Sequence, residues 1–346
     1  QMCIRDRVGA ATYQDEDPVD TVLSILSDPK RWIAVPFIEV EDAELSKEFF
    51  DGRRKVSPTD IAAKGQDLDR LMERARRAEN LQKIGAFKAR GATNAIMSLD
   101  AEALRHGIAT HSSGNHGQAV AYAASVVGAT ATIVMPDHAA SVKVDAIRAY
   151  GADIIMCPQP EREARLAELV AESGATVVHP FDDPAVVAGQ GTATLELVED
   201  VPGLDVVITP IGGGGLLSGS TLVANAAGIP TVGAEPEVVD DAHRSLRDGV
   251  RHPATGSYSV GDGLLTGIGA IPYEILSESD TSIITVSESG ILDAMRYVIE
   301  RTKLLIEPSA ATVFAAMFTE PARFAGKRVG VVISGGNVDL GKLAAG

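Results

Sequence analysis

The chain has 346 residues, of which 45% are hydrophobic and 23% are charged, and this is enough for one large domain or two smaller ones. Its formal net charge of −16, without any basic run, argues against nucleic acid as a partner. No apolar run approaches the about 20 residues of a membrane-spanning helix, and no stretch resembles a signal peptide. The two cysteines, Cys3 and Cys157, lack a metal-ligand spacing. The sequence therefore predicts a cytoplasmic protein without a membrane partner.

Residues 1–78 differ from the rest of the chain. They contain charged clusters such as Asp15–Asp17 and Arg74–Arg77, and their apolar pattern is weak. We interpret residues 1–78 as an atypical N-terminal segment that is either divergent or partly disordered.

From residue 107 onward, β-rich runs alternate with alanine-rich helical patterns. The runs typical of strands are Gly107–His111, Ala131–Met135, Asp153–Cys157 and Thr176–His179. The helical patterns are Gly117–Val127, Ser141–Tyr150 and Glu161–Ser173. Glycines follow them at Gly128, Gly151 and Gly174, where a helix C-cap needs positive φ.

A second series follows. Its predicted strands are Val206–Pro210, Thr231–Glu235, Ser282–Val286 and Arg328–Ile333, and its predicted helices are Thr192–Leu197, Leu216–Ala227, Glu288–Arg301 and Ser309–Met317. Alternation of this kind indicates βαβ units. The fold class is therefore α/β, with two doubly wound, mostly parallel sheet domains and an active site between them.

Four consecutive glycines, Gly212–Gly215, lie between a predicted strand and a predicted helix. Glycines at such a junction allow backbone N–H groups to close on an anion, and the helix dipole adds to the attraction. A phosphate site is favoured over a simple tight turn. A dinucleotide site remains an alternative, because Glu235 ends the next strand where a ribose-binding acid would lie. Ser218 occupies the third glycine position of that fingerprint, so the match is partial.

Two other turns follow predicted strands. The serine–asparagine turn, Ser112–Gln118, suits either helix capping or a second anion site for a substrate carboxylate. Ser334–Asn337 suits a simple turn as well as a ligand contact.

Lys88 follows Phe87 and opens the helical pattern Ala89–Met97. A lone lysine is usually a solvated surface residue. At a helix start, however, its charge faces an unfavourable dipole, and this favours the neutral amine that attacks aldehydes.

These motifs together resemble the fold-type II pyridoxal-phosphate enzymes, which share the tryptophan synthase β-like fold. The motifs are Lys83–Gly91, Ser112–Gln118, Gly212–Leu216 and Ser334–Asn337, in this order. The chain is most similar to the serine racemase and serine/threonine dehydratase branch, from about Glu79 to Leu340. Before Glu79 the strand and the Arg-Thr-Pro segment that the family carries are missing. The resemblance implies a larger, cofactor-binding domain of residues 79–106 and 185–346, and a smaller, substrate-carboxylate domain of residues 107–184.

The resemblance also implies how pyridoxal 5'-phosphate is bound. Lys88 forms a Schiff base with the cofactor and Phe87 packs against its ring. Asn115 hydrogen-bonds the ring hydroxyl, and Ser334 faces the pyridine nitrogen. The phosphate accepts N–H groups of the loop formed by Gly212, Gly213, Gly214, Gly215 and Leu216.

Substrate and metal contacts follow from the same resemblance. The substrate carboxylate lies on the turn formed by Ser112, Ser113, Gly114, Asn115 and His116. Lys88 is the catalytic base, and Ser113 is the catalytic residue that exchanges a proton on the opposite face in racemases. Glu235 and Asp241 supply carboxylates, and Val239 its carbonyl, to Mg²⁺ (or Ca²⁺ or Mn²⁺), because these are hard oxygen ligands. An acidic surface loop without metal is the alternative.

The expected function is β-elimination of L-serine or L-threonine to a 2-oxo acid, pyruvate or 2-oxobutanoate, and ammonia. The alternatives are a serine racemase and a 3-hydroxyaspartate ammonia-lyase. A β-replacement synthase and a non-catalytic binding module rank lower, the latter because Lys88 and the glycine run are intact. The family suggests a homodimer, and the partner is a small hydroxy-amino-acid substrate.

Overall fold

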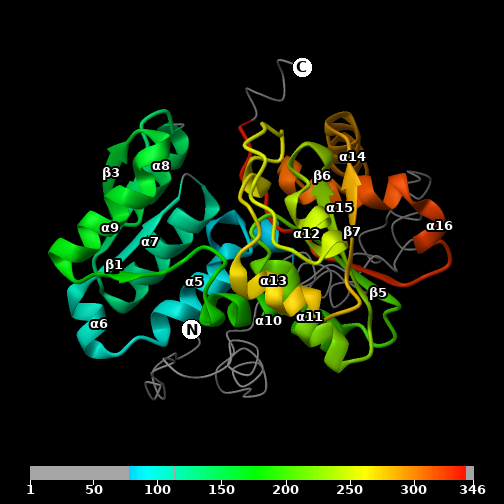
Figure 1. The fold of residues 1–346 in the computed structure, drawn as a ribbon, viewed down its shortest axis with the longest axis horizontal. Helices are drawn as coiled ribbons and strands as arrows, with labels where there is room; N and C mark the ends of the chain where they lie inside the picture. Colours follow the sequence, from blue (N-terminus) through cyan, green and yellow to red (C-terminus); the bar gives the residue numbers. More distant parts are fainter. Residues whose placement is uncertain (1–77, 113, 140, 340–346) are drawn as a thin grey trace, which may run out of the picture.

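The structure is a computed structural model that describes residues 78–112, 114–139 and 141–339. The divergent segment expected at residues 1–78 therefore lies outside the described residues, except for Ala78, and so does the expected catalytic residue Ser113. The described chain forms two halves, each built on a four-stranded parallel sheet (Figure 1).

The first sheet has the strand order β3-β2-β1-β4, and all of its pairs are parallel. Its strands are β1 (Ile108–His111), β2 (Ala131–Pro136), β3 (Asp153–Cys157) and β4 (Thr176–Val177). Its helices are α6 (Ala101–His106), α7 (Asn115–Val127), α8 (Ser141–Ala149) and α9 (Arg162–Ser173). Parallel strands need such crossover helices, which cover the faces of the sheet.

The second sheet has the order β7-β6-β5-β8 and is also parallel throughout. Its strands are β5 (Val206–Pro210), β6 (Thr231–Pro236), β7 (Ser282–Val286) and β8 (Val329–Val331). Its helices are α11 (Gly215–Ala226), α12 (Asp241–Asp248), α13 (Ala270–Ser277), α14 (Glu288–Thr302), α15 (Pro308–Thr319) and α16 (Pro321–Phe324). Short 3-10 turns complete it at η5 (Glu237–Val239) and η6 (Asp262–Leu264).

Two helices join the halves. α5 (Lys88–Met97) packs on both α7 and α10 (Pro184–Asp200), and α10 also packs on α11. Glycines allow the close approach, since a Cβ added at Gly91 would lie 2.7 Å from the carbonyl oxygen of Val186. A Cβ at Gly219 would lie 2.6 Å from the backbone nitrogen of Gly191. Larger side chains would separate the helices and displace the start of α5.

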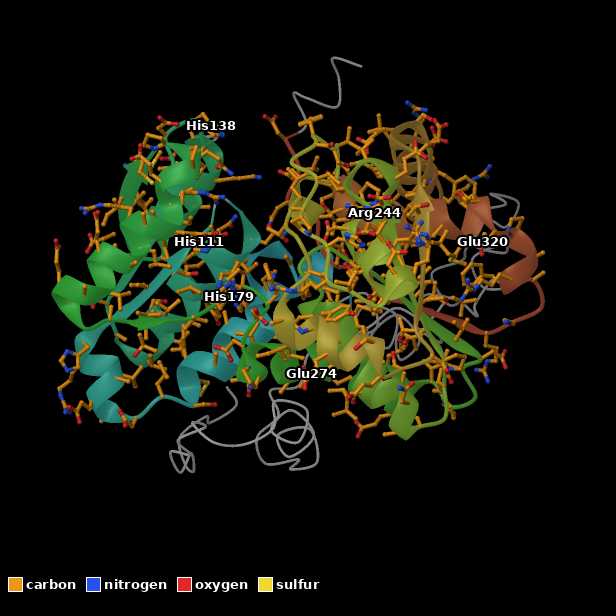
Figure 2. The ribbon with its side chains drawn as sticks, in the orientation of Figure 1. His111, His138, His179, Arg244, Glu274 and Glu320 are labelled. Carbon is orange, nitrogen blue, oxygen red and sulfur yellow. The ribbon has the colours of Figure 1, made fainter. Side chains whose placement is uncertain are left out.

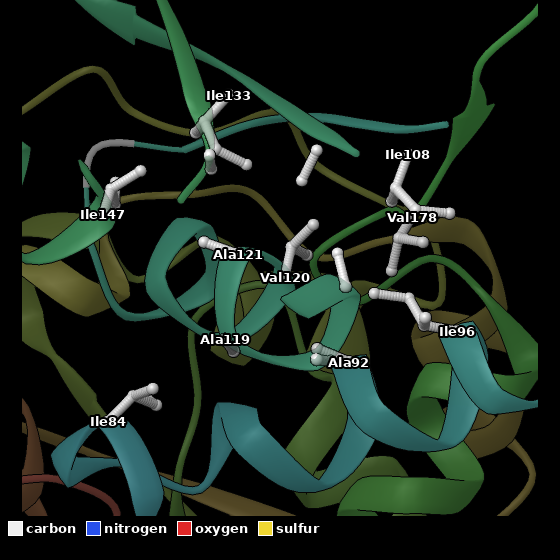
Figure 3. Close-up of a cluster of buried hydrophobic side chains, with 14 of the residues drawn as sticks. Ile84, Ala92, Ile96, Ile108, Ala119, Val120, Ala121, Ile133, Ile147 and Val178 are labelled. Atoms are coloured by element: carbon white, nitrogen blue, oxygen red, sulfur yellow. The ribbon is translucent and has the colours of Figure 1, made fainter. Parts of the chain in front are cut away.

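The core of the first half fills the space between its sheet and the helices α5 and α7 (Figure 3). Small residues of α7, such as Ala119 and Ala123, leave room for the fully buried Ile96, Ile133 and Ile147. Each such isoleucine contributes about 1.5–3 kcal/mol relative to its exposed state. This packing holds α5, and therefore Lys88, against the first sheet.

The two parallel sheets confirm the predicted fold class and every predicted strand, with ends that agree to within two residues. The glycines Gly128, Gly151 and Gly174 have φ of 72°, 82° and 71°, as their C-cap positions require. The predicted helix Thr192–Leu197 is only part of α10, which begins where Asp183 accepts hydrogen bonds from the N–H groups of Ala185 and Val186. The sequence patterns did not predict α6, α12, α13 or α16. Within the described ranges, no helix is long and apolar enough to cross a membrane.

Candidate active site

Lys88 is the first residue of α5, and its Nζ donates a hydrogen bond to the carbonyl oxygen of Pro180 at 2.6 Å. Burial lowers the pKa of Lys88 to about 8. Lys88 Nζ also lies 5.2 Å from the centre of the Phe87 ring. In the described part of the chain, no carboxylate forms an ion pair with Lys88, so a neutral amine is readily accessible near neutral pH.

The turn after β8 fixes the approach to α5. Ala86 and Gly335 form an isolated antiparallel bridge, and Phe87 donates its backbone N–H to the carbonyl oxygen of Ser334 at 3.0 Å. Ser334 is 2% exposed. The structure thus brings Lys88 and Ser334 together, although they lie far apart in the sequence.

The glycine loop (Gly212–Gly215) connects β5 to α11. Gly214 is the N-cap of α11 with φ of 91°, a conformation that disfavours other residues. Gly213 lies under the Phe181 ring, because a Cβ there would be 2.2 Å from the ring carbon Cδ1. The first N–H groups of a helix have no intrahelical partner and are available to an anion. Phe87 packs on the cluster that contains Leu216, which links this loop to the Lys88 segment.

The serine–asparagine turn precedes α7. Its residue Gly114 is the N-cap, and among the described residues no side chain caps the helix there. Ser112 Oγ accepts the N–H of Gly114 at 3.2 Å. The side chain of Asn115 points to a carboxylate instead, with Nδ2 at 3.0 and 3.1 Å from the two oxygens of Glu307. The simpler interpretation of this turn was helix capping by its side chains. The Asn115 side chain does not cap the helix, because it binds Glu307.

Three histidines lie in or beside this turn. His116 is 3% exposed; its Nε2 is 2.9 Å from the carbonyl oxygen of Val178, and its buried Nδ1 has no partner among the described residues. His111 and His179 meet edge to face at 6.2 Å between ring centres (Figure 2). Burial holds the pKa of His116 well below its usual value and lowers that of His179 to about 4. The neutral rings leave Nδ1 of His116 as an acceptor, since Nε2 must donate to the carbonyl.

The acidic loop (Glu235–Asp241) lies at the carboxyl end of β6, beside the glycine loop at the end of β5. Glu235 and Asp241 are each 1% exposed. Glu235 accepts the N–H groups of Ala242 and His243 at 3.1 and 2.9 Å, at the start of α12. Burial, with the Asp241 charge contributing, raises the pKa of Glu235 to about 8, and burial also raises that of Asp241.

The Glu235 side chain thus caps the N-terminus of α12, and the sequence did not suggest this contact. Val239, the third expected ligand, is in η5 and is 1% exposed. No group of three or more His, Cys, Asp or Glu side chains suited to a metal occurs in the described ranges. The residues expected to bind metal therefore amount to two carboxylates and one carbonyl.

Four residues near Lys88 and Asn115 were missed by sequence reasoning: Lys143, Phe181, Asp262 and Glu307. Lys143 Nζ binds Asp262 Oδ2 at 2.7 Å, joining α8 of the first half to η6 of the second. Glu307 had a signal in the sequence, because it is an acid directly before Pro308 at the start of a helix, after the apolar run Leu304–Ile306. Its partner Asn115 is 192 residues away, so no local pattern could have paired them.

Comparison with known proteins gives these contacts a context. The family model described as "Pyridoxal-phosphate dependent enzyme" matches residues 76–335. The chain is 46% identical to a serine racemase of Dictyostelium discoideum over 78% of this chain and 85% of the relative. It is 44% identical to a beta-hydroxyaspartate dehydratase of Paracoccus denitrificans, over 77% of this chain and 86% of the relative. The solved structure of threonine deaminase isoform 2 from Solanum lycopersicum superposes with a TM-score of 0.74 at 31% identity. The match covers 78% of this chain and 80% of that structure's chain. The chain belongs to the pyridoxal-phosphate dependent enzyme family, in its serine racemase and dehydratase branch.

Proposed function

We propose that the chain catalyses β-elimination of L-serine and L-threonine, with release of pyruvate or 2-oxobutanoate and ammonia. The observation that carries the proposal is the buried amine of Lys88, whose pKa is lowered to about 8 and which lies beside the Ser334 turn. Membership of the family supports it, since its relatives here are named racemases, dehydratases and deaminases.

The described residues fit pyridoxal phosphate. The glycine loop and the start of α11 offer N–H groups to a phosphate, and Lys88 offers an amine to an aldehyde. Ser334 would face the ring nitrogen as a neutral partner, and Asn115 the ring hydroxyl. Phe87 would pack against the ring. When bound, the cofactor supplies the aldehyde that captures the substrate amine and the ring that takes up the electron pair released at the α-carbon.

Binding of the substrate carboxylate and removal of the α-proton belong to groups of the chain itself. The serine–asparagine turn, with Ser112, Gly114 and His116, would hold the α-carboxylate by N–H groups at the start of α7. This orients the α-hydrogen toward Lys88, whose neutral Nζ would remove it as general base. His116 would contribute its backbone N–H, because its ring offers the carboxylate no donor; burial holds the pKa of His116 well below its usual value, so the ring is a weak competitor for the proton.

A racemase is the second candidate, because the relative from Dictyostelium discoideum at 46% identity is a serine racemase. A 3-hydroxyaspartate ammonia-lyase is the third, given the relative from Paracoccus denitrificans. The racemase requires a proton donor opposite Lys88. The family resemblance implies that role for Ser113, which lies outside the described residues, so the assignment stays a prediction.

A substrate panel tests the proposal. Purified protein is given L-serine, L-threonine, D-serine and threo-3-hydroxyaspartate, and oxo-acid release is measured together with product chirality. We expect oxo acid from L-serine and L-threonine, and Lys88→Ala should lower its rate by at least about a thousandfold. Inversion without any oxo acid would show a racemase instead.

Absorbance tests the cofactor role of Lys88 separately. Bound pyridoxal phosphate should give a band at about 410–420 nm that Lys88→Ala removes. Lys83→Ala is the matched control, because Lys83 is an exposed lysine in the same segment. A wild-type preparation that stays colourless with added cofactor would contradict the proposal.

We further propose that the acidic loop binds Mg²⁺. Two almost fully buried carboxylates, Glu235 and Asp241, make a hard oxygen pair in which each charge disfavours the other. A divalent cation would relieve that repulsion. At 100 times its dissociation constant, Mg²⁺ should stabilise the chain by about 2.7 kcal/mol, seen as a rise in Tm. Asp241→Asn should abolish the rise while keeping an oxygen for its hydrogen bond to Ile268; an equal rise in this variant would contradict the site.

Domain boundaries, oligomeric state and compartment remain proposals as well. We propose a smaller domain of residues 107–184 and a larger one of residues 79–106 and 185–346, supported by the two separate sheets. The homodimer is expected from the family resemblance, and the cytoplasmic location from the cysteine usage and the lack of a signal-type stretch. Light scattering on the purified chain would measure its mass in solution, and a monomer would contradict the dimer.

A further inference from the structure

Glu307 is a buried acid at the point where several parts of the site meet. It directly precedes Pro308 and α15, and it is 5% exposed. Its backbone N–H donates to the carbonyl oxygen of Gly335 at 3.0 Å. A Cβ added at Gly335 would lie only 2.6 Å from Glu307 Oε1. The carboxylate is therefore held against the same turn that bridges to Ala86, two residues before Lys88.

The side chain of Glu307 determines the orientation of Asn115. Both carboxylate oxygens accept from Asn115 Nδ2, at 3.0 and 3.1 Å. On its other side, Asn115 Oδ1 accepts from Asn337 Nδ2 at 2.9 Å, and Asn337 also donates to the carbonyl oxygen of Ile84 at 2.6 Å. A carboxylate only accepts, so the amide nitrogen of Asn115 must face Glu307. The amide cannot flip without losing both contacts.

One hydrogen of the Asn115 amide stays available in this arrangement. The two N–H bonds of an amide diverge too widely for both to reach one carboxylate, so a single N–H is shared between the two oxygens of Glu307. The second N–H points away from Glu307. This is the donor that a ring hydroxyl or its anion would accept from.

The charge of Glu307 has little local compensation. Within the described residues, no cation lies at ion-pair distance from it. The charged groups that act on the pKa of Glu307 are Asp262 on η6 and Lys143 on α8. These two are paired with each other at 2.7 Å. Burial raises the pKa of Glu307 to about 7, and its hydrogen bonds to Asn115 and to the backbone of Asn337 oppose the rise. Its main stabilising partner is thus Asn115.

We propose that Glu307 is a positioning residue, which holds the Asn115 amide with its free N–H directed at the ring oxygen of the cofactor. This rests on the proposed role of Asn115 in binding the cofactor ring. Glu307 does not touch the substrate and takes no proton from it. Its effect on the cofactor passes through Asn115, and this makes its role separable by experiment.

A double-mutant cycle with the cofactor as probe tests the inference. The dissociation constant of pyridoxal phosphate is measured by absorbance and by equilibrium dialysis for wild type, Glu307→Ala, Asn115→Ala and the double variant. We expect each single change to weaken binding about tenfold. The double variant should bind no more weakly than Asn115→Ala, because Glu307 has no effect once Asn115 is absent. Additive losses would overturn the proposal, since they would show that Glu307 acts by another route.

Glu307→Gln provides a second readout that a merely structural role would not change. At high pH the variant should bind the cofactor more weakly than wild type, because wild type then has the charged acceptor. As the pH falls through about 7, wild type loses that charge and the two dissociation constants should converge. The ratio of the two dissociation constants is compared at each pH, because the titration of groups that both proteins share cancels in this ratio. A ratio that is constant with pH would count against the role.

Glu288→Gln is the matched control. Its carboxylate accepts from Ser259 Oγ and from the backbone N–H of Val260, away from Asn115. It should leave the cofactor affinity and its pH dependence unchanged, and an equal loss in this variant would also overturn the proposal. If Glu307→Ala fails to fold, the comparison of wild type with Glu307→Gln across pH still tests the proposal. Wild type that binds no cofactor would contradict the proposed function instead, which distinguishes the two failures.

Discussion

At the scale of single residues, the environment of Lys88 favours its uncharged form. Its Nζ has one described partner, the carbonyl oxygen of Pro180, and burial lowers the pKa from 10.5 to about 8. A carbonyl can accept from either form of the amine, so it does not restore the charged state. The amine is thus prepared for attack on an aldehyde, at a cost to the stability of the cofactor-free chain.

That cost predicts a pH dependence of stability. Below pH 8, folding must bury the charged form of Lys88. Between pH 8 and 10.5, the lysine is protonated in the unfolded chain and neutral in the folded chain. The free energy of unfolding therefore rises with pH over this range. The rise for wild type should be up to about 3 kcal/mol, and Lys88→Met should lack it. Urea unfolding of cofactor-free protein across this range measures it, with Lys83→Met as control. Parallel profiles for wild type and Lys88→Met would refute the effect.

Single residues also show why the sequence predicted only part of the site. Lys88 and the glycine loop are each recognisable within a few neighbouring positions. Glu307 and Asn115 form a pair across 192 residues, and Lys143 meets Asp262 across 119. Such pairs depend on how the two sheets face each other, which no local pattern contains. The direction of the Asn115 side chain could not be predicted for the same reason.

At the scale of elements, a buried charge network anchors α5. Arg90 makes a two-point contact with Glu79, with Nε at 3.0 Å and Nη2 at 2.9 Å from the two carboxylate oxygens. It also bonds Thr192 and Glu196 of α10. Since Arg90 is two residues after Lys88, the network fixes the helix turn that carries the amine.

Removing the arginine should therefore be costly. Arg90→Met leaves the buried Glu79 without its charge partner, and we expect a loss of about 3–5 kcal/mol in the free energy of unfolding. Weaker cofactor binding should accompany it, because the start of α5 shifts. Urea unfolding measures the first effect and absorbance the second. Arg165→Met is the control, since Arg165 pairs with Glu168 on the exposed face of α9 and should leave both unchanged. A small loss for Arg90→Met would contradict the anchoring role.

Elements were predicted well where one pattern sufficed. The strands were recognisable because both sheets are parallel and covered, which gives short runs of β-branched residues. Helix α12 was missed because it begins within the acidic loop, where Glu235 of the preceding strand supplies the acceptors for its first N–H groups. That capping group lies seven residues before Ala242, beyond the usual range of a capping pattern.

At the scale of the whole molecule, one short segment joins the acidic loop to the glycine loop. Ile268 donates its N–H to Asp241 Oδ2 at 2.9 Å, and the next residue, Gly269, donates its N–H to the carbonyl oxygen of Gly213 at 3.1 Å. Asp182 reaches the same segment, where it accepts from Ala270 and Ile271 at the start of α13. A cation that draws Asp241 toward Glu235 would therefore act on the loop proposed to hold the phosphate.

This connection predicts that metal and cofactor strengthen each other's binding. Adding Mg²⁺ should tighten pyridoxal phosphate binding about fivefold, and saturating cofactor should tighten Mg²⁺ binding by the same factor, because a coupling free energy is reciprocal. Isothermal titration in both orders measures the two factors. Asp241→Asn should remove the coupling, whereas Asp293→Asn, which changes an exposed pair on α14, should keep it. Metal binding without any change in cofactor affinity would show that Ile268 and Gly269 hold the two loops in place but transmit nothing between them.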